Sequence, residues 1–129
     1  MVAYRPDIVV IYLCTNDFST ARQPHELIFA QRYMELLNKV KANYGEDIPI
    51  LCMASNVTPF SFDYIRTACV MSGLKNVSYM GVTTNVHNHS TDLGASAHPN
   101  YRGHIKVASN VIPYISSITG WEMTEQPYK

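Results

Sequence analysis

The chain alternates between short apolar runs and longer stretches in which apolar and polar residues are mixed. Residues 7–13 form a continuous run rich in β-branched side chains, with a proline before it and polar residues after it. Residues 48–54 form a second buried run, and residues 76–80, in which polar and apolar side chains alternate, are expected to form a short third strand. Runs of this kind are typical of strands buried on both faces, as in parallel sheets. The pattern therefore predicts three strands.

Three amphipathic helices are predicted to follow these strands. The first spans 24–44, the second spans 61–72 and is closed by Gly73, and the third spans 100–118. In the third, Pro113 is expected to kink or shorten the helix. The first helix has the three-and-four spacing of a face packed on a sheet. That predicted face comprises Leu27, Ala30, Tyr33, Met34, Leu37, Val40 and Tyr44.

The alternation of strand and helix indicates an α/β protein with a parallel sheet and right-handed connections. About three strands are expected, with flanking helices. No internal repeat, low-complexity segment or linker divides the sequence. We therefore expect residues 1–129 to form a single α/β domain.

Composition narrows the classes of partner. The sequence is 47% hydrophobic and 16% charged, and ten basic residues balance ten acidic ones. A nucleic-acid binder would carry a basic patch, and none is evident, so no nucleic acid is expected as a partner. No apolar run reaches the roughly 20 residues of a membrane span, and no signal peptide is recognisable, so a soluble chain is expected. The compartment stays open, and a secreted parent protein is compatible with the sequence. No cofactor is indicated.

Two polar loops follow the first and second predicted strands, at the sheet edge where α/β proteins form their sites. They contain Asn16 and Ser55. A long polar connection then covers residues 81–97, and such connections are more often functional than idle. It leads to His98, which Pro99 holds in an extended conformation outside the last helix. A loop histidine of this kind can titrate near neutral pH.

Two segments carry a resemblance to a known family. The first segment resembles a strand that ends in Gly-x-Asn-Asp, and its sequence is Pro6-Asp7-Ile8-Val9-Val10-Ile11-Tyr12-Leu13-Cys14-Thr15-Asn16-Asp17. The second segment resembles a late His-Pro-Asn-x-x-Gly-His block, and its sequence is His98-Pro99-Asn100-Tyr101-Arg102-Gly103-His104. Both blocks, in this order, are found in SGNH (GDSL-like) hydrolases. In amino-acid sequence, residues 15–19 and 94–100 look most like the corresponding segments of acetyl esterases of carbohydrate esterase family two.

The resemblance implies a partial flavodoxin-like, three-layer α/β sandwich and the hydrolysis of esters, with acetyl esters on carbohydrate as the closest match. It implies a serine acyl-enzyme mechanism in which Asn16 belongs to the oxyanion hole and His98 is the general base and acid. The substrate would be a small-molecule or carbohydrate ester. Aromatic residues could line a sugar cleft or fill the core, and both interpretations stay open. These are Tyr12, Phe60, Phe62, Tyr64, Tyr79 and Tyr101.

The sequence departs from the family in its nucleophile. The 129 residues contain no Gly-Asp-Ser block. Ser19, Ser55 and Ser61 lie in plausible loops but lack the strand-to-helix turn that presents a nucleophile. The resemblance covers the C-terminal half or so of such a domain, so the chain is expected to be inactive alone. A missing N-terminal segment, or self-association, would complete its sheet.

Two further departures concern single positions. Cys14 stands where the family has glycine, which requires that the backbone there needs no positive φ. Either a buried thiol or a reactive one fits this position, and buried free thiols are expected for the three cysteines as a set. Ala95 stands where many members have the aspartate that orients the histidine, and Asp92 is six residues before His98 rather than three.

Two rival functions remain open. One is a catalytically inactive, truncated or partner-completed module that retains the scaffold and two site residues. The other is a metal-binding α/β domain that uses His87, His89 and Asp92, because two imidazoles at alternate positions of an extended segment point the same way.

Overall fold

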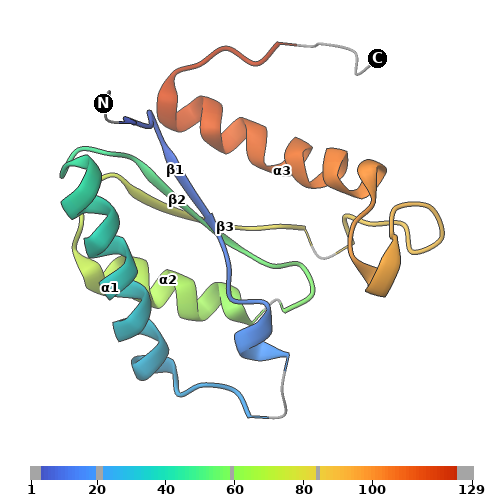
Figure 1. The fold of residues 1–129 in the computed structure, drawn as a ribbon, viewed down its shortest axis with the longest axis horizontal. Helices are drawn as coiled ribbons and strands as arrows, with labels where there is room; N and C mark the ends of the chain where they lie inside the picture. The colour runs from blue at the N-terminus through green and yellow to red at the C-terminus, as the bar shows by residue number, and fades with distance from the viewer. Residues whose placement is uncertain (1–3, 20–21, 59, 84, 125–129) are drawn as a thin grey trace. The chain divides into compact units, whose positions relative to one another are not determined.

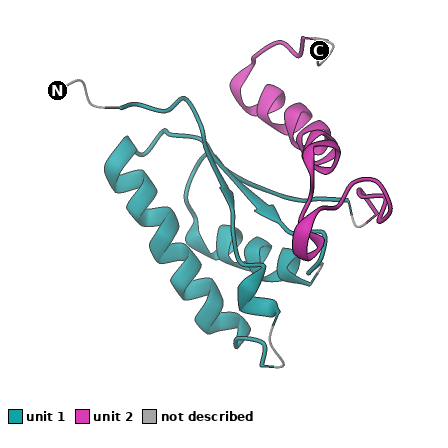
Figure 2. Ribbon diagram, turned by 45° about the vertical axis from the view of Figure 1, so that its right-hand side comes forward, with its two compact units in different colours: residues 1–84 teal, residues 85–129 magenta. Residues whose placement is uncertain are grey.

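The computed structural model describes residues 4–19, 22–58, 60–83 and 85–124. The chain divides into two compact units, residues 1–84 and residues 85–129 (Figure 2). Two compact units can be parts of one domain, so the single domain stays a prediction.

The first unit is built on a three-stranded parallel sheet. Strand β1 spans Val9–Tyr12, β2 spans Ile50–Ala54 and β3 spans Val77–Gly81, in the order β1-β2-β3. The register pairs Val9 with Ile50, and Ile50 with Val77. The predicted α/β class and the three parallel strands are therefore confirmed.

Both helices of the first unit lie on one face of this sheet. Helix α1 spans Glu26–Tyr44 and α2 spans Ser61–Ser72, and Figure 1 shows them side by side on the same side of the strands. The strands follow one another in sequence order, so two right-handed connections step in the same direction and place both helices on the same face. The core between them and the sheet includes Ile11, Phe29, Leu37, Ile50, Cys52, Ile65 and Ala68.

The buried face of α1 differs from the predicted one at its ends. Leu27 is 52% exposed and Tyr44 is 44% exposed, so placing them in the core was wrong. Phe29 is buried instead, and its ring stacks on Tyr33 and packs at a tilt against Phe18. These ring contacts set the rotation of the helix, which residue spacing alone leaves loose by a position or so.

The second unit contains a short 3-10 turn over Ala95–Ala97 and helix α3, which spans Tyr101–Thr119. Helix α3 continues through Pro113, so the predicted shortening of the helix was wrong. A proline removes one helical hydrogen bond, and here the residues on both sides keep their helical geometry. No helix in the described ranges is both long and apolar enough to cross a bilayer.

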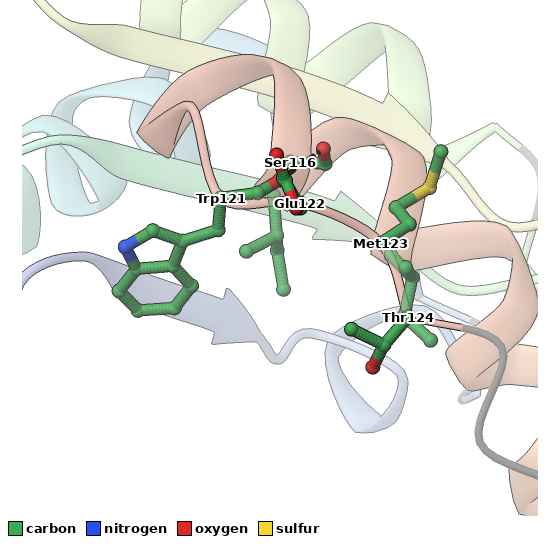
Figure 3. A pocket seen from close by; sticks show the side chains of 7 residues that line it. Ser116, Trp121, Glu122, Met123 and Thr124 are labelled. Carbon is green, nitrogen blue, oxygen red and sulfur yellow. Dashed lines mark hydrogen bonds between the residues drawn. The ribbon is translucent and has the colours of Figure 1, made fainter.

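The chain turns back after α3 at Gly120, whose φ of 76° lies in the left-handed region that favours glycine. The Ser116 hydroxyl donates to the carbonyl oxygen of Trp121 at 2.5 Å, which holds residues 121–124 beside the helix. An open hollow of about 360 Å³ lies between the two segments (Figure 3). Its lining is Ile112, Ile115, Ser116, Trp121, Glu122, Met123 and Thr124. The Trp121 ring itself is half exposed.

Candidate functional site

Asn16 lies four residues beyond the end of β1, in the loop at the carboxyl end of the strand, as the sequence predicted. It begins a 3-10 turn over Asn16–Phe18, and its carbonyl oxygen accepts hydrogen bonds from the Ser19 amide at 3.4 Å and the Ser19 hydroxyl at 3.0 Å. The side chain is exposed, and within the described residues its amide makes no hydrogen bond. The amide group is therefore free to donate to a ligand.

Phe18 anchors this turn. It is 5% exposed, and its ring centroid lies 5.3 Å from Phe29, 5.5 Å from Phe60 and 5.1 Å from Tyr64. Edge and tilted ring contacts at these distances are favourable in addition to the apolar area they bury. Phe18 thus fixes the backbone two residues after Asn16. Sequence reasoning missed it, although a single phenylalanine within a polar loop is the signal that could have revealed it.

Cys14 has a φ of 81°, in the left-handed region. The expectation that the backbone needs no positive φ here was wrong, because the chain keeps the glycine-like conformation without the glycine. Burial, Asp17 and Cys52 together raise the pKa of the Cys14 thiol to about 12. A thiol with this pKa is protonated near neutral pH, so the reactive-thiol interpretation is disfavoured. All three cysteines are free, and Cys52 and Cys69 are buried.

The backbone strain at Cys14 should reverse the usual effect of alanine and glycine substitutions on the free energy of unfolding. Alanine stabilises a protein more than glycine at ordinary positions, but a side chain at positive φ costs roughly 1–3 kcal/mol. We expect Cys14→Gly to be more stable than Cys14→Ala by about 1 kcal/mol. Urea unfolding of both variants measures the difference. The alanine variant proving equal or better would show that this backbone is not strained.

An open hollow of about 450 Å³ lies at the end of β1, lined by residues 12–17. Tyr12 is 43% exposed, and Tyr101 in the second unit is 66% exposed. The other aromatic residues considered for a sugar cleft are in ring clusters. Phe60 and Tyr64 surround Phe18, and the Phe62 and Tyr79 rings lie 5.8 Å apart, edge to face. Ring packing therefore accounts for four of the six.

The three candidate serines are hydrogen-bonded within the first unit. The Ser19 hydroxyl donates to the Asn16 carbonyl, and the buried Ser55 hydroxyl accepts from the Val57 amide at 3.2 Å. The Ser61 hydroxyl is buried and accepts from Thr58 at 3.4 Å. None of these serines is bonded to a histidine in the described ranges, so the structure does not single out a nucleophile among them.

The loop that carries His98 is held tightly by its backbone. The His98 amide donates to the Ala95 carbonyl at 3.1 Å, and its carbonyl accepts from the Gly94 amide at 2.7 Å. Ser96 and Ala97, directly before it, have φ values of 54° and 58°, and both are left-handed non-glycine residues. Such residues persist only where the surrounding structure enforces them, and they cluster at functional sites.

The His98 side chain is exposed. In the part of the chain that the structure describes, neither a carboxylate nor a carbonyl oxygen is bonded to its ring. Among the described residues the imidazole is therefore available to a ligand, and the backbone hydrogen bonds fix the position of its Cα atom.

Asn100 joins this loop to α3. Its side-chain oxygen accepts from the amides of Arg102 at 3.0 Å and Gly103 at 3.2 Å, which caps the helix. Its side-chain nitrogen donates to the carbonyls of Thr91 at 2.9 Å and Leu93 at 3.3 Å. One side chain thus fixes both the start of α3 and the segment before the His98 loop.

Gly103 allows the loop to pack this closely on α3. A Cβ atom at this position would lie 2.4 Å from the Asp92 carbonyl oxygen and 2.9 Å from the Pro99 Cβ. Real Cβ atoms do not approach backbone this closely, so the Gly of the His-Pro-Asn-x-x-Gly-His block is a packing requirement here.

The proposed metal ligands do not form a metal site. Among the described residues, no three His, Cys, Asp or Glu side chains are grouped so that they could hold an ion. Asp92 is engaged with Lys106, His89 is exposed, and the buried Nε2 of His87 has no hydrogen-bond partner. The alternate spacing of the two histidines did not bring them together with Asp92, because the carboxylate is turned toward α3.

Asp92 is 1% exposed and strongly held as an anion. The Lys106 ammonium, the Asn88 amide and the Thr91 hydroxyl hold the pKa of this carboxyl down at about 2. A carboxylate that accepts several hydrogen bonds favours its charged form in this way. Asp92 therefore remains a carboxylate at any pH well above 2.

The fold and these residues define an α/β protein with an exposed asparagine in the loop after its first strand and an exposed histidine in a second loop. Cellulase/esterase CelE of Acetivibrio thermocellus is 29% identical over 125 residues, which are 92% of this chain and 15% of that protein. No protein-family model matches the chain, and no solved structure matches it. The comparison relates the chain to an esterase and does not distinguish a finer family.

Proposed function

We propose that this chain supplies the oxyanion-hole asparagine and the general base of a serine esterase of the SGNH type, acting on acetyl esters of carbohydrates. The observation that carries the proposal is the loop at His98, in which two left-handed, non-glycine residues precede an imidazole that has no hydrogen bond to any residue the structure describes. Backbone strain held in place beside an exposed titratable group favours a functional role for that group. The similarity to a cellulase/esterase supports ester hydrolysis as the reaction.

In the proposed mechanism a serine hydroxyl attacks the ester carbonyl carbon, and His98 accepts its proton. The Asn16 amide donates a hydrogen bond to the carbonyl oxygen as that oxygen becomes negative. The intermediate then expels the alcohol, which takes the proton from His98, and leaves an acyl-serine. Water, deprotonated by His98, attacks the acyl-serine, which releases the acid and restores the serine.

The serine has to come from a Gly-Asp-Ser segment, which the 129 residues do not contain. Within the described strands, β1 pairs only with β2, so one edge of β1 has unpaired amide and carbonyl groups. An unpaired edge can accept a further strand. We propose that the nucleophile-bearing segment adds that strand, and that a second copy of the chain occupies the edge when the segment is absent.

The test joins a Gly-Asp-Ser-bearing N-terminal segment of a GDSL-type esterase to this chain, giving what we call the completed enzyme. We expect the isolated chain to hydrolyse nitrophenyl acetate at the background rate and to sediment as an oligomer. The completed enzyme should be a monomer with measurable esterase activity toward the same substrate and toward acetylated xylan. Strong activity of the isolated chain would refute the requirement for an added serine and direct attention to Ser19 and Ser55.

A further inference from the structure

We propose that the ion pair between Asp92 and Lys106 is a positioning device for His98, an inference that rests on the function proposed above. The Asp92 carboxylate is buried and accepts three hydrogen bonds. Its Oδ2 accepts from the Asn88 amide at 2.5 Å and from the Lys106 ammonium, and its Oδ1 accepts from the Thr91 hydroxyl at 3.0 Å. The carboxylate thus joins the polar connection before His98 to the second turn of α3.

The main chain of Asp92 is part of the structure that holds His98. Its carbonyl oxygen accepts from the Asn100 amide at 2.9 Å, and the Gly94 amide donates to the His98 carbonyl at 2.7 Å. These two bonds flank an antiparallel bridge between Leu93 and Pro99. His98 therefore lies on a two-rung ladder, and Asp92 is the residue of that ladder whose side chain is tied to α3.

The ladder closes a very short loop, and the loop is strained. Only residues 95–97 connect its two sides, and two of the three are left-handed non-glycine residues. Such residues relax toward ordinary φ values when the surrounding bonds weaken. Releasing Asp92 from Lys106 would let this loop relax, and His98 follows it directly in the chain.

The effect on His98 would pass through the backbone. In the described ranges no hydrogen bond joins the Asp92 carboxylate to the His98 ring, and three of the roughly four acceptor positions of the carboxylate are used by Asn88, Thr91 and Lys106. Asp92 is therefore assigned as a positioning residue, not as the acid that orients the imidazole directly.

The first arm of the test uses the 129-residue chain and does not depend on catalysis. Backbone and histidine-ring NMR signals are compared in the unaltered chain, Asp92→Asn, Lys106→Met and Lys106→Arg. We expect the first two variants to broaden or double the signals of Ser96, Ala97 and His98, and Lys106→Arg to preserve them. The control is Asp47→Asn, which removes the exposed pair between Asp47 and Lys75, 2.6 Å apart in the first unit.

The second arm measures kinetics in the completed enzyme. A small misplacement of a catalytic group costs up to about a hundredfold, so we expect kcat to fall by about tenfold to a hundredfold in Asp92→Asn and in Lys106→Met. KM should change little, and the double variant should be no worse than either single one, because both remove the same link. Asp47→Asn should keep the original kcat, and Lys106→Arg should keep most of it.

The outcomes separate the two proposals. Unchanged His98 signals in Asp92→Asn and Lys106→Met would overturn the positioning role, whatever the completed enzyme does. An inactive completed enzyme would remove the proposed function, while the NMR comparison would still decide whether the pair holds His98. If Asp92→Asn fails to fold, Lys106→Met decides the question, because the Lys106 side chain is 45% exposed and its loss leaves no cavity in the core.

Discussion

Replacing His98 with alanine in the completed enzyme should lower kcat by about a hundredfold to ten-thousandfold, the usual contribution of a general base. The imidazole makes no hydrogen bond within the described residues, so its removal leaves no buried group without a partner. The exposed side chain also contributes little to the core. The loss should therefore appear in the acylation rate, measured with nitrophenyl acetate, and not in the urea midpoint.

The matched control for this change is His89→Ala, which removes another exposed histidine from the same unit. It should retain the original kcat. Groups that act as a unit are not additive, so combining His98→Ala with loss of the nucleophilic serine should be no worse than losing the serine alone. An His98→Ala enzyme that kept its original rate would assign the base to another residue and leave the strained loop without the role proposed for it.

The local pattern was sufficient to predict most of the fold. Helix α2 begins at Ser61 and ends at Ser72 as predicted, because Gly73 supplies a left-handed stop. Strand β1 is shorter than its apolar run, since residues form a strand only where β2 is there to pair with them. The rotation of α1 could not be predicted, because it depends on the ring of Phe18, a residue from a different part of the chain.

The backbone placement of the candidate site residues was predictable where one strong local rule applied. Asn16 follows a strand end, and His98 precedes a proline, so both positions follow from the sequence. The left-handed conformations of Cys14, Ser96 and Ala97 could not be predicted from the sequence, because these residue types do not favour positive φ.

The ion pair between Asp92 and Lys106 also could not be predicted from the sequence. The two residues are 14 positions apart. A lone aspartate in a polar loop can equally be a metal ligand, a solvated charge or one half of an ion pair. Only the fold of the loop onto α3 distinguishes these possibilities, and that fold depends on the close packing at Gly103.

Replacing Asn16 with alanine in the completed enzyme should lower kcat by about a hundredfold to a thousandfold, which is the usual effect of removing one oxyanion donor. The donor acts on an oxygen whose charge develops only in the transition state, so KM should change little. The Asn16 side chain is exposed and unbonded among the described residues, so the stability should stay within about 0.5 kcal/mol of the original. Steady-state kinetics together with urea unfolding measure both quantities.

Two further variants distinguish a hydrogen-bond donor from a shape requirement. Asn16→Asp retains the size of the side chain but loses the donor and adds a negative charge beside the developing oxyanion, so its kcat should fall at least as far as that of Asn16→Ala. Asn38→Ala is the control, because it removes an exposed asparagine of α1 whose side chain donates to the Met34 carbonyl at 2.9 Å. If Asn16→Asp retained activity while Asn16→Ala lost it, Asn16 would be filling space. The oxyanion would then be stabilised by backbone amides alone.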